Sequence, residues 1–199
     1  MNKSYFIQRT VHIRSGKIWE NEKLVWEDEQ PVLQDFLKNA YRELAMDYPK
    51  FFKMDSLSKL AIQATEVLFS HAKPDEDTAL IFGNSASSLE TDEAFSASMN
   101  SFPSPSVFVY TLPNIMLGEI SIKHRLLSEN LFLVMENFDA ELFENQLSAA
   151  LAQPDCANAV CGWVDLHNDE YDVFLCLIGT EGKWPFHAEN LQKLYRLNE

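Results

Sequence analysis

The sequence predicts an α/β fold built on one mainly parallel sheet with helices on both faces. Residues 78–83 and 131–134 are short, continuously apolar runs, which is typical of strands that are buried on both faces of a sheet. Segments with helical spacing alternate with these runs, as expected for crossover connections between parallel strands. The last two expected strands, 157–165 and 171–178, flank a polar turn and must therefore run antiparallel to each other.

Length and composition set the first limits. The chain has 199 residues, of which 46% are apolar and 23% charged, so it can form one sizeable core; we expect a single domain over residues 1–199. No apolar run approaches the roughly 20 residues that span a bilayer, and the first residues lack a signal-peptide core. Three Cys residues indicate a reducing compartment rather than a disulfide framework. The expectation is a cytoplasmic protein that does not bind a membrane.

Charge argues against nucleic acid as a ligand. Thirty acidic and sixteen basic residues give a net charge of −14, which repels a phosphate backbone. No Lys or Arg occurs between Arg125 and Lys183, and we interpret this stretch as a solvated acidic surface. The bases gather earlier in the chain, at Lys38, Arg42, Lys50, Lys53, Lys59, Lys123 and Arg125.

The first third of the chain is expected to form strands and then helices. Residues 5–13 alternate and are rich in β-formers, with a turn at Ser15 and Gly16, and residues 23–27 form a second short strand. Helical spacing begins at Pro31 and ends before Pro49. A second helix, with Asp55 or Ser56 as its cap, carries a broad apolar stripe over residues 57–68.

The middle of the chain alternates between strand and helix. After the strand at 78–83, residues 84–88 turn and residues 89–99 have helical character. Residues 101–106 are irregular, and residues 107–110 are predicted to be extended because β-formers dominate them. Helical spacing returns at 112–124, with Pro113 in the first turn.

The last third adds an amphipathic helix at 139–151, the hairpin and a terminal helix around 187–197. If the hairpin is centred between Asn168 and Asp169, Cys161 lies opposite Cys176 and Trp163 lies opposite Phe174.

One motif suggests nucleophilic catalysis. The turn from Gly83 to Ser87 follows a buried strand and precedes a helix, as a G-x-S-x-G nucleophile elbow does, with Ser85 as the nucleophile. His124 or His187 would then be the base. The motif departs from the elbow at Ser87, where a second glycine is required, and this favours a polar turn with Ser87 or Ser88 as a helix cap.

No metal or cofactor site is predicted. The five His residues have no ligand spacing, Cys156 and Cys161 are too far apart for a tight pair, and no Gly-rich phosphate loop occurs. Cys161 and Cys176 lie inside expected strands, where a thiol commonly acts as a small apolar group.

Four segments in register resemble the β-ketoacyl synthases, the condensing enzymes of the thiolase fold. Residues 54–61 (MDSLSKLA) are similar to the family's R-M-D-x-x-x-x-L-A helix start, and residues 80–84 with 88–91 are similar to its G-G-L-E-T strand and turn. Residues 104–105 with 112–122 resemble its S-P … L-P-N segment, and residues 160–165 resemble its A-x-x-G-G-x-D/E strand.

The resemblance implies the fold of one thiolase-type half: a five-stranded mixed sheet in the order 3-2-1-4-5, with the fifth strand antiparallel. It covers the N-terminal half only, so the second half with the family's catalytic His residues is missing. The family's nucleophilic Cys position falls at or beside Phe138, whose ring cannot form a thioester. The acids Glu136, Asp139 and Glu141 would also raise the pKa of any thiol placed there.

The resemblance also implies partners. In complete synthases this half packs its inner helices against the second half and its third strand against a partner chain. The corresponding expected interface is Leu112, Ile115, Met116, Ile120, Leu131, Phe132, Leu133 and Val134. The resulting hypothesis is a non-catalytic accessory subunit of fatty-acid, polyene or polyketide type synthesis. It would form a homodimer or a heterodimer with a full-length synthase, with acyl carrier protein as a further candidate partner. A serine hydrolase using Ser85 and one half of a split condensing enzyme remain alternatives.

Overall fold

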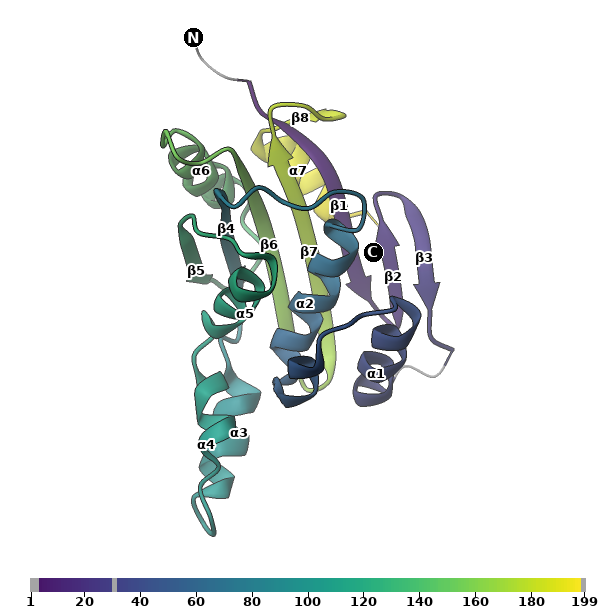
Figure 1. Cartoon of the computed structure of the whole chain (residues 1–199), viewed down its shortest axis with the longest axis vertical. Coiled ribbons are helices and arrows are strands. Elements are labelled where there is room, and N and C mark those ends of the chain that lie inside the picture. Colours follow the sequence, from purple (N-terminus) through teal and green to yellow (C-terminus); the bar gives the residue numbers. More distant parts are fainter. Residues whose placement is uncertain (1–3, 30–31, 198–199) are drawn as a thin grey trace.

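A mixed sheet forms the centre of the molecule (Figure 1). The computed structural model describes residues 4–29 and 32–197, so the expected helix start at Pro31 lies outside the described residues. The strands are β1 (Phe6–Arg14), β2 (Lys17–Glu20), β3 (Lys23–Glu27), β4 (Thr78–Asn84), β5 (Asn130–Val134), β6 (Asn158–His167), β7 (Glu170–Gly179) and β8 (Trp184–Pro185). Their order is β3-β2-β1-β7-β6-β4-β5, and β8 pairs with β1.

The expected α/β class is confirmed, and so is the antiparallel last strand. β4 is parallel to both β5 and β6, whereas β7 is antiparallel to β6 and to β1. The hairpin has the expected register, with Cys161 opposite Cys176 and Trp163 opposite Phe174. Asn168 and Asp169 both adopt positive φ angles, 53° and 62°, which is the conformation that joins two twisted strands by a two-residue turn.

The sheet is larger than the expected five strands, and its first strand takes a different place. Numbered along the chain, the long strands β1, β4, β5, β6 and β7 lie in the order 3-2-4-5-1 rather than 3-2-1-4-5. β4 pairs directly with β6, from Thr78 opposite Asn158 to Gly83 opposite Trp163, so no strand fits between them. β1 instead covers the outer edge of β7 and buries Val11 and Ile13. The short strand β2, which sequence analysis did not predict, and β3 extend the sheet beyond β1.

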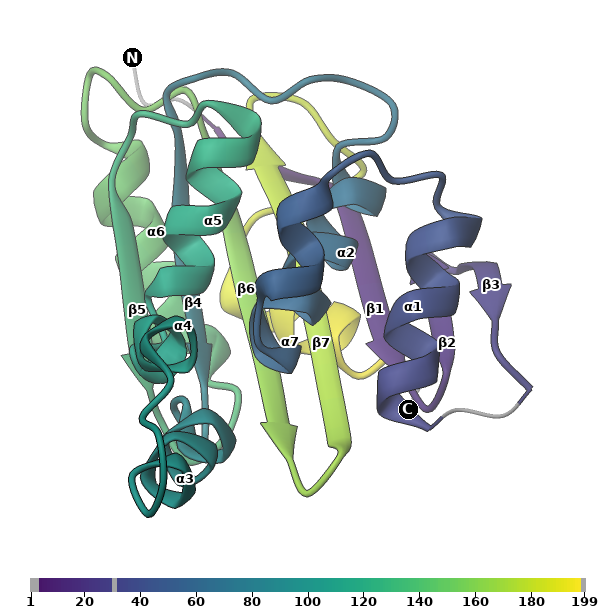
Figure 2. The ribbon, with the colours of Figure 1, turned by 60° about the horizontal axis from the view of Figure 1, so that its bottom comes forward.

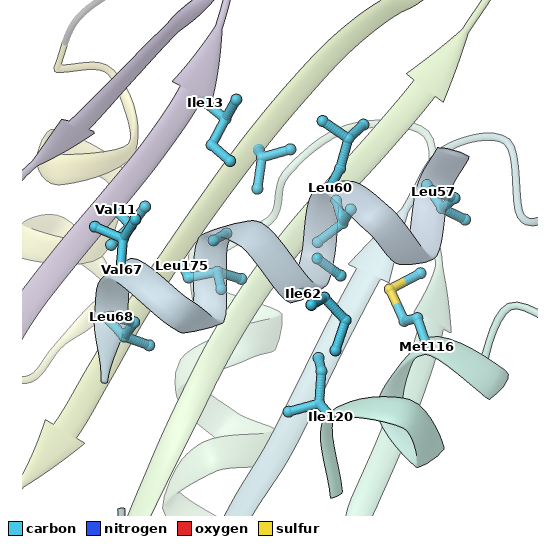
Figure 3. Close-up of a cluster of buried hydrophobic side chains, with 14 of the residues drawn as sticks. Val11, Ile13, Leu57, Leu60, Ile62, Val67, Leu68, Met116, Ile120 and Leu175 are labelled. Atoms are coloured by element: carbon cyan, nitrogen blue, oxygen red, sulfur yellow. The ribbon is translucent and has the colours of Figure 1, made fainter. Parts of the chain in front are cut away.

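Helices cover both faces of the sheet, as expected (Figure 2). On one face lie α1 (Leu33–Glu43), α2 (Ser56–Leu68) and α5 (Ile115–His124), and on the other lie α6 (Ala140–Leu151) and α7 (Ala188–Tyr195). Asp55 caps α2 by accepting a hydrogen bond from the backbone N–H of Ser58 at 3.1 Å. Figure 3 shows α2 packed between the strand residues Val11 and Leu175 and the helix α5.

An arm extends from the body between β4 and α5 (Figures 1 and 2). It consists of α3 (Leu89–Ser98), α4 (Pro105–Phe108) and a 3-10 turn (Val109–Thr111). The extended conformation predicted for residues 107–110 is therefore wrong. Pro105 starts a helical turn there, and no neighbouring strand offers hydrogen bonds that would hold these β-formers extended. None of the side chains of α3 is buried, so the arm forms little of the core.

Candidate functional site

Phe138, which sequence analysis expected to lie at or beside the position of the family's nucleophile, belongs to the core. It lies in the loop between β5 and α6, directly before the cap residue Asp139, and only 8% of its surface is exposed. Its ring stacks on Tyr195 of α7, with ring centroids 4.2 Å apart, and on Phe143 of α6 at 5.2 Å. The edges of Trp163 and Phe174 complete the cluster. Phe138 therefore joins two helices to the sheet.

The surroundings of this loop offer no condensing chemistry. A shallow hollow of about 620 Å³ adjoins the loop, lined by residues 135–141 and by Ala188, Glu189 and Gln192 of α7. Its lining includes no Cys, Ser, His, Lys or Arg among the described residues. The acidic side chains Glu136, Asp139 and Glu141 are exposed around it. A hollow of this charge disfavours both a thiolate and an anionic substrate.

The three Cys residues are buried and form no disulfides. Cys161 and Cys176 face each other across the hairpin, and both are fully buried. Burial raises the pKa of Cys161, and the neighbouring Cys176 thiol raises it further. Burial also raises the pKa of Cys156. The raised pKa values favour the protonated form of Cys156 and Cys161, and the buried Cys side chains act as small apolar groups.

Ser85 lacks the base that a nucleophilic serine requires. Its hydroxyl donates to the Asp165 carboxylate, 2.7 Å from Oδ2, and its backbone N–H donates to Oδ1 at 3.0 Å. No described His hydrogen bonds to it. His124 lies 3.2 Å from Glu66, and the side chain of His187 caps α7. The Ser85 turn is thus anchored by an acid, without the His that would relay the proton.

Side-chain hydrogen bonds of Asn84 and Ser88 hold the remainder of this turn in place. The buried side chain of Asn84 accepts a hydrogen bond from the Ser87 N–H and donates one to the Ser87 carbonyl, both at 2.8 Å. Ser87 has a φ of 56°, in the left-handed region that glycine adopts most readily. Ser88 is the N-cap residue of α3, but its hydroxyl donates to the Thr111 carbonyl at 2.5 Å and ties the two ends of the arm together.

The outer edge of β5 is the most prominent uncovered apolar feature of the sheet. Leu131 is 38% exposed and Val134 59%, and Leu112 at the base of the arm is 58% exposed. The strand pairs with β4 in an unbroken register from Asn130 to Val134, so it has no bulge. No acidic or basic residue occurs at 130–135. Phe132 and Leu133, together with Ile115 of α5, are partly buried.

Two residues of the expected interface belong to the core instead. Met116 and Ile120 are 1% and 0% exposed, because they lie on the face of α5 that packs against α2 (Figure 3). The helical spacing placed them on the apolar stripe of α5 but could not decide whether that stripe faces the sheet or a partner.

The arm adds uncharged surface next to this edge. Residues 94–118 contain no Asp, Glu, Lys or Arg, although 23% of the whole chain is charged. Phe102 at the tip of the arm is 92% exposed, and Met99, Phe108 and Val109 are also exposed. The arm lies at the β5 side of the molecule in both ribbon views (Figures 1 and 2). Exposed apolar surface of this extent is typical of an interaction site.

The expected basic group does not form a free cationic patch. Lys50 pairs with the buried carboxylate of Glu119 at 2.7 Å, and Lys123 pairs with Glu66 at 3.3 Å. Burial lowers the pKa of Lys59. Of the five bases at 50, 53, 59, 123 and 125, Lys50, Lys53 and Arg125 are exposed, and Lys50 is engaged by Glu119.

The C-terminal helix α7 is held firmly over the face that α6 also covers. Arg14 of β1 donates to the Tyr195 and Leu197 carbonyls at 2.9 and 3.0 Å, and the Tyr195 hydroxyl donates to Asp172 at 2.5 Å. His12 Nε2 lies 3.0 Å from the Leu194 carbonyl. The outward side chains of α6 and α7 are exposed polar residues, among them Glu141, Asn145, Ser148, Glu189 and Lys193.

The described residues contain neither a candidate metal centre nor a candidate membrane-spanning helix. No group of three or more His, Cys, Asp or Glu side chains there could hold a metal ion. No helix in this part of the chain is both long and apolar enough to cross a membrane.

Solved structures of ketosynthases share this fold. A chain in the complex of a ketosynthase with its chain length factor from Xenorhabdus doucetiae superposes with a TM-score of 0.59 at 14% identity, over 98% of this chain and 91% of that one. The ishigamide ketosynthase/chain length factor superposes with a TM-score of 0.60 at 14% identity, over 88% of this chain and 62% of that one. A chain in the structure of a type II PKS acyl-carrier protein in complex with its ketosynthase bound to the hexaketide superposes with a TM-score of 0.58 at 12% identity. The match covers 96% of this chain and 65% of that one.

At these identities the comparisons show the fold, and they confirm the ketosynthase-like, thiolase-type architecture that the sequence motifs suggested. The chain spans less than two thirds of the matched chains in the second and third structures. No protein-family model matches the sequence, and no curated protein matches it.

Proposed function

We propose that this chain is a non-catalytic accessory subunit of a condensing system for fatty-acid, polyene or polyketide type synthesis, and that it acts by pairing with a catalytic ketosynthase. The observation that carries the proposal is the burial of Phe138 among Tyr195, Phe143, Trp163 and Phe174 at the position of the nucleophile. A condensing enzyme needs an attacking thiolate there, and an aromatic core residue cannot supply it.

The β5 edge supports pairing as the mode of action. Soluble proteins protect edge strands with charges, bulges or short length, because an open edge binds other strands. The opposite edge of this sheet follows that rule: β3 carries Lys23 and Glu27, Glu27 pairs with Lys17 at 2.9 Å, and the β2–β3 register shifts. β5 has none of these protections, and it lies beside the uncharged arm.

The solved structures add support from length. The chain in the ketosynthase and chain length factor complex is matched over 91% of its own length, so a chain of similar size occurs in such an assembly. In our proposal the catalytic partner supplies the nucleophile and binds the acyl carrier protein. The engagement of Lys50 and Lys123 with Glu119 and Glu66 argues against strong carrier docking on this chain.

The two alternatives find less support. A serine hydrolase would need a base beside Ser85, and among the described residues the hydrogen bonds of that hydroxyl go to the Asp165 carboxylate. Half of a split synthase would need an open inner helical layer for the missing half to pack on. In α5, the helix of the expected interface, Met116 and Ile120 are already buried in the core. On the other face of the sheet, α7 lies next to α6, and the outward side chains of both helices are polar.

Reconstitution with a ketosynthase from the same organism tests the pairing. We expect a stable complex by size-exclusion chromatography with light scattering. Replacing Leu131 and Val134 with Lys should abolish it, because charge on an exposed edge blocks strand pairing while leaving the core intact. The matched control replaces Leu24 and Val25, two equally exposed residues of the other edge strand, with Lys. Equal loss in both variants would contradict pairing through β5.

Covalent labelling tests the catalytic half of the proposal. After incubation with an acyl-carrier thioester, intact-mass spectrometry should detect the acyl group on the synthase and none on this chain. An acyl adduct on this chain would refute the non-catalytic assignment, whatever the outcome of the pairing experiment.

A further inference from the structure

A cavity of about 300 Å³ lies where the arm joins the body of the protein. Its lining comes from the start of α2, the start of α3, one residue of α4 and the end of β6. The buried side chains of Leu57 and Leu166 line it from the body, and Ala94 and Val107 line it from the arm. This volume is at the lower end of the range for small-molecule sites. The cavity is separate from the hollow beside Phe138, and its lining includes no residue of β5.

Polar contacts hold the start of α3 against the body. The Thr91 hydroxyl donates to the Asp55 carboxylate at 3.1 Å, and the backbone N–H of Asp169 donates to Glu90 at 3.4 Å. None of the ten described residues of α3 is buried, so this helix leaves the space beside the body unfilled. The result is a largely apolar cavity with two carboxylates in its lining.

The charge of the cavity is negative. Asp55 and Glu90 both line it, and none of the described residues in its lining is Lys, Arg or His. Lys59, one turn along α2, interacts with the charge of Asp55, but its ammonium group lies 6.0 Å from the centre of the Phe51 ring and outside the lining. Burial raises the pKa of Asp55, because water has little access to its carboxylate. A cation beside that carboxylate would stabilise its charged form.

Asp55 retains hydrogen-bonding capacity for a ligand. Its carboxylate accepts hydrogen bonds from the Ser58 N–H and the Thr91 hydroxyl, both at 3.1 Å, and from the Ser58 hydroxyl. A carboxylate offers about four acceptor positions, so at least one remains. An ammonium group can donate there and also brings the positive charge that two carboxylates favour, whereas an anionic ligand would be repelled.

We infer that this cavity binds a small organic ammonium ion. The apolar part of the ion packs against Leu57, Val107 and Leu166, and its charged group donates to Asp55, with Glu90 as a second negative charge in the lining. Because the lining comes from both α2 and α3, a bound ion connects the arm to the body. The site does not depend on pairing through β5, so reconstitution with a ketosynthase neither supports nor refutes it.

Three probes of similar shape and different charge test this site: phenylethylammonium, phenylethanol and phenylacetate. Titration of the isotope-labelled chain followed by NMR measures each dissociation constant and shows which backbone amides shift. We expect the ammonium ion to bind at least about tenfold more tightly than the alcohol, because its hydrogen bond to Asp55 is charge-assisted. Phenylacetate should bind more weakly than either. The shifts should concentrate at residues 55–57, 87–94 and 166.

Substitutions separate the charge of the site from its shape. Asp55→Asn retains a helix cap and Glu90→Gln retains the side-chain length, and each should weaken binding of the ammonium ion by about threefold or more. Glu93→Gln removes the same charge from an exposed position of α3 outside the lining, so the dissociation constant should change by less than about twofold. Ala94→Trp fills part of the cavity and should weaken the ammonium and alcohol probes alike.

Four results would overturn the inference. These are equal affinity for the three probes, unchanged ammonium affinity in both acid variants, shifts confined to residues outside the lining, and no saturable binding at about 20 mM phenylethylammonium. The first two would show that the carboxylates do not select the ligand, and the last two would show that the cavity does not bind it.

Discussion

Removing the ring of Phe138 should destabilise the whole domain. The side chain is 8% exposed and touches four aromatic residues, with Tyr195 stacked at 4.2 Å. Replacing a fully buried Phe by Ala costs about 3 to 5 kcal/mol. Because one edge of this ring is open to the hollow beside α6, we place Phe138→Ala near the low end, at about 3 kcal/mol of unfolding free energy. For a chain of this size that corresponds to roughly 6 to 12 °C in melting temperature.

Urea unfolding followed by circular dichroism measures this loss. An unchanged slope of unfolding free energy against urea concentration indicates that the substitution changes stability alone. Phe102→Ala is the matched control, because it removes the same ring from a position that is 92% exposed and should change stability by less than about 0.5 kcal/mol. Equal, small effects in both variants would refute the reasoning, since Phe138 would then have no role in the core and its place at the nucleophile position would need another explanation.

Three further perturbations follow from the packing. Burial lowers the pKa of His12 from 6.5 to about 4, so the unfolded state binds a proton more readily than the folded state does. The unfolding free energy should therefore fall by about 3 kcal/mol as the pH is lowered from 6.5 to 4. His12→Gln should flatten that part of an acid-unfolding profile. Asp55→Ala should lower the unfolding free energy by about 1 kcal/mol through loss of the α2 cap, whereas Asp55→Asn should nearly preserve it in thermal melts. Gly162→Ala should cost about 1 to 3 kcal/mol in urea unfolding, because the added Cβ would lie 2.5 Å from Phe82 ring carbons; an unchanged midpoint would contradict that close packing.

Local patterns predicted most of the secondary structure. The hairpin register followed from the two-residue turn at Asn168 and Asp169, because a short turn leaves one alignment of the flanking strands. The α2 cap at Asp55 and the buried strand β4 likewise depend on neighbouring residues. Two of the errors concern segments whose conformation depends on distant contacts. Residues 107–110 have β-forming side chains but no strand beside them, and the four-residue strand β2 exists because β1 and β3 flank it.

At the candidate site too, local residues predicted some features and distant contacts decided others. The family resemblance predicted that the nucleophile position falls at or beside Phe138, and a phenyl ring cannot form a thioester, because side-chain identity alone decides that chemistry. Whether Phe138 fills the core or lines a pocket could not be predicted, because its stacking partner Tyr195 is distant in sequence. Sequence analysis also did not single out Asp165, which holds the Ser85 hydroxyl from a neighbouring strand.

The amino-acid sequence by itself determined the α/β class, the hairpin and the α2 cap, because these depend on side-chain chemistry and on contacts within a few residues. Only the tertiary structure decided that β1 lies beyond β7, that Met116 and Ile120 face α2, and that β5 remains an open edge. Strand order and the direction of a helical stripe depend on which surfaces exclude water together, and that is settled when the distant segments pack.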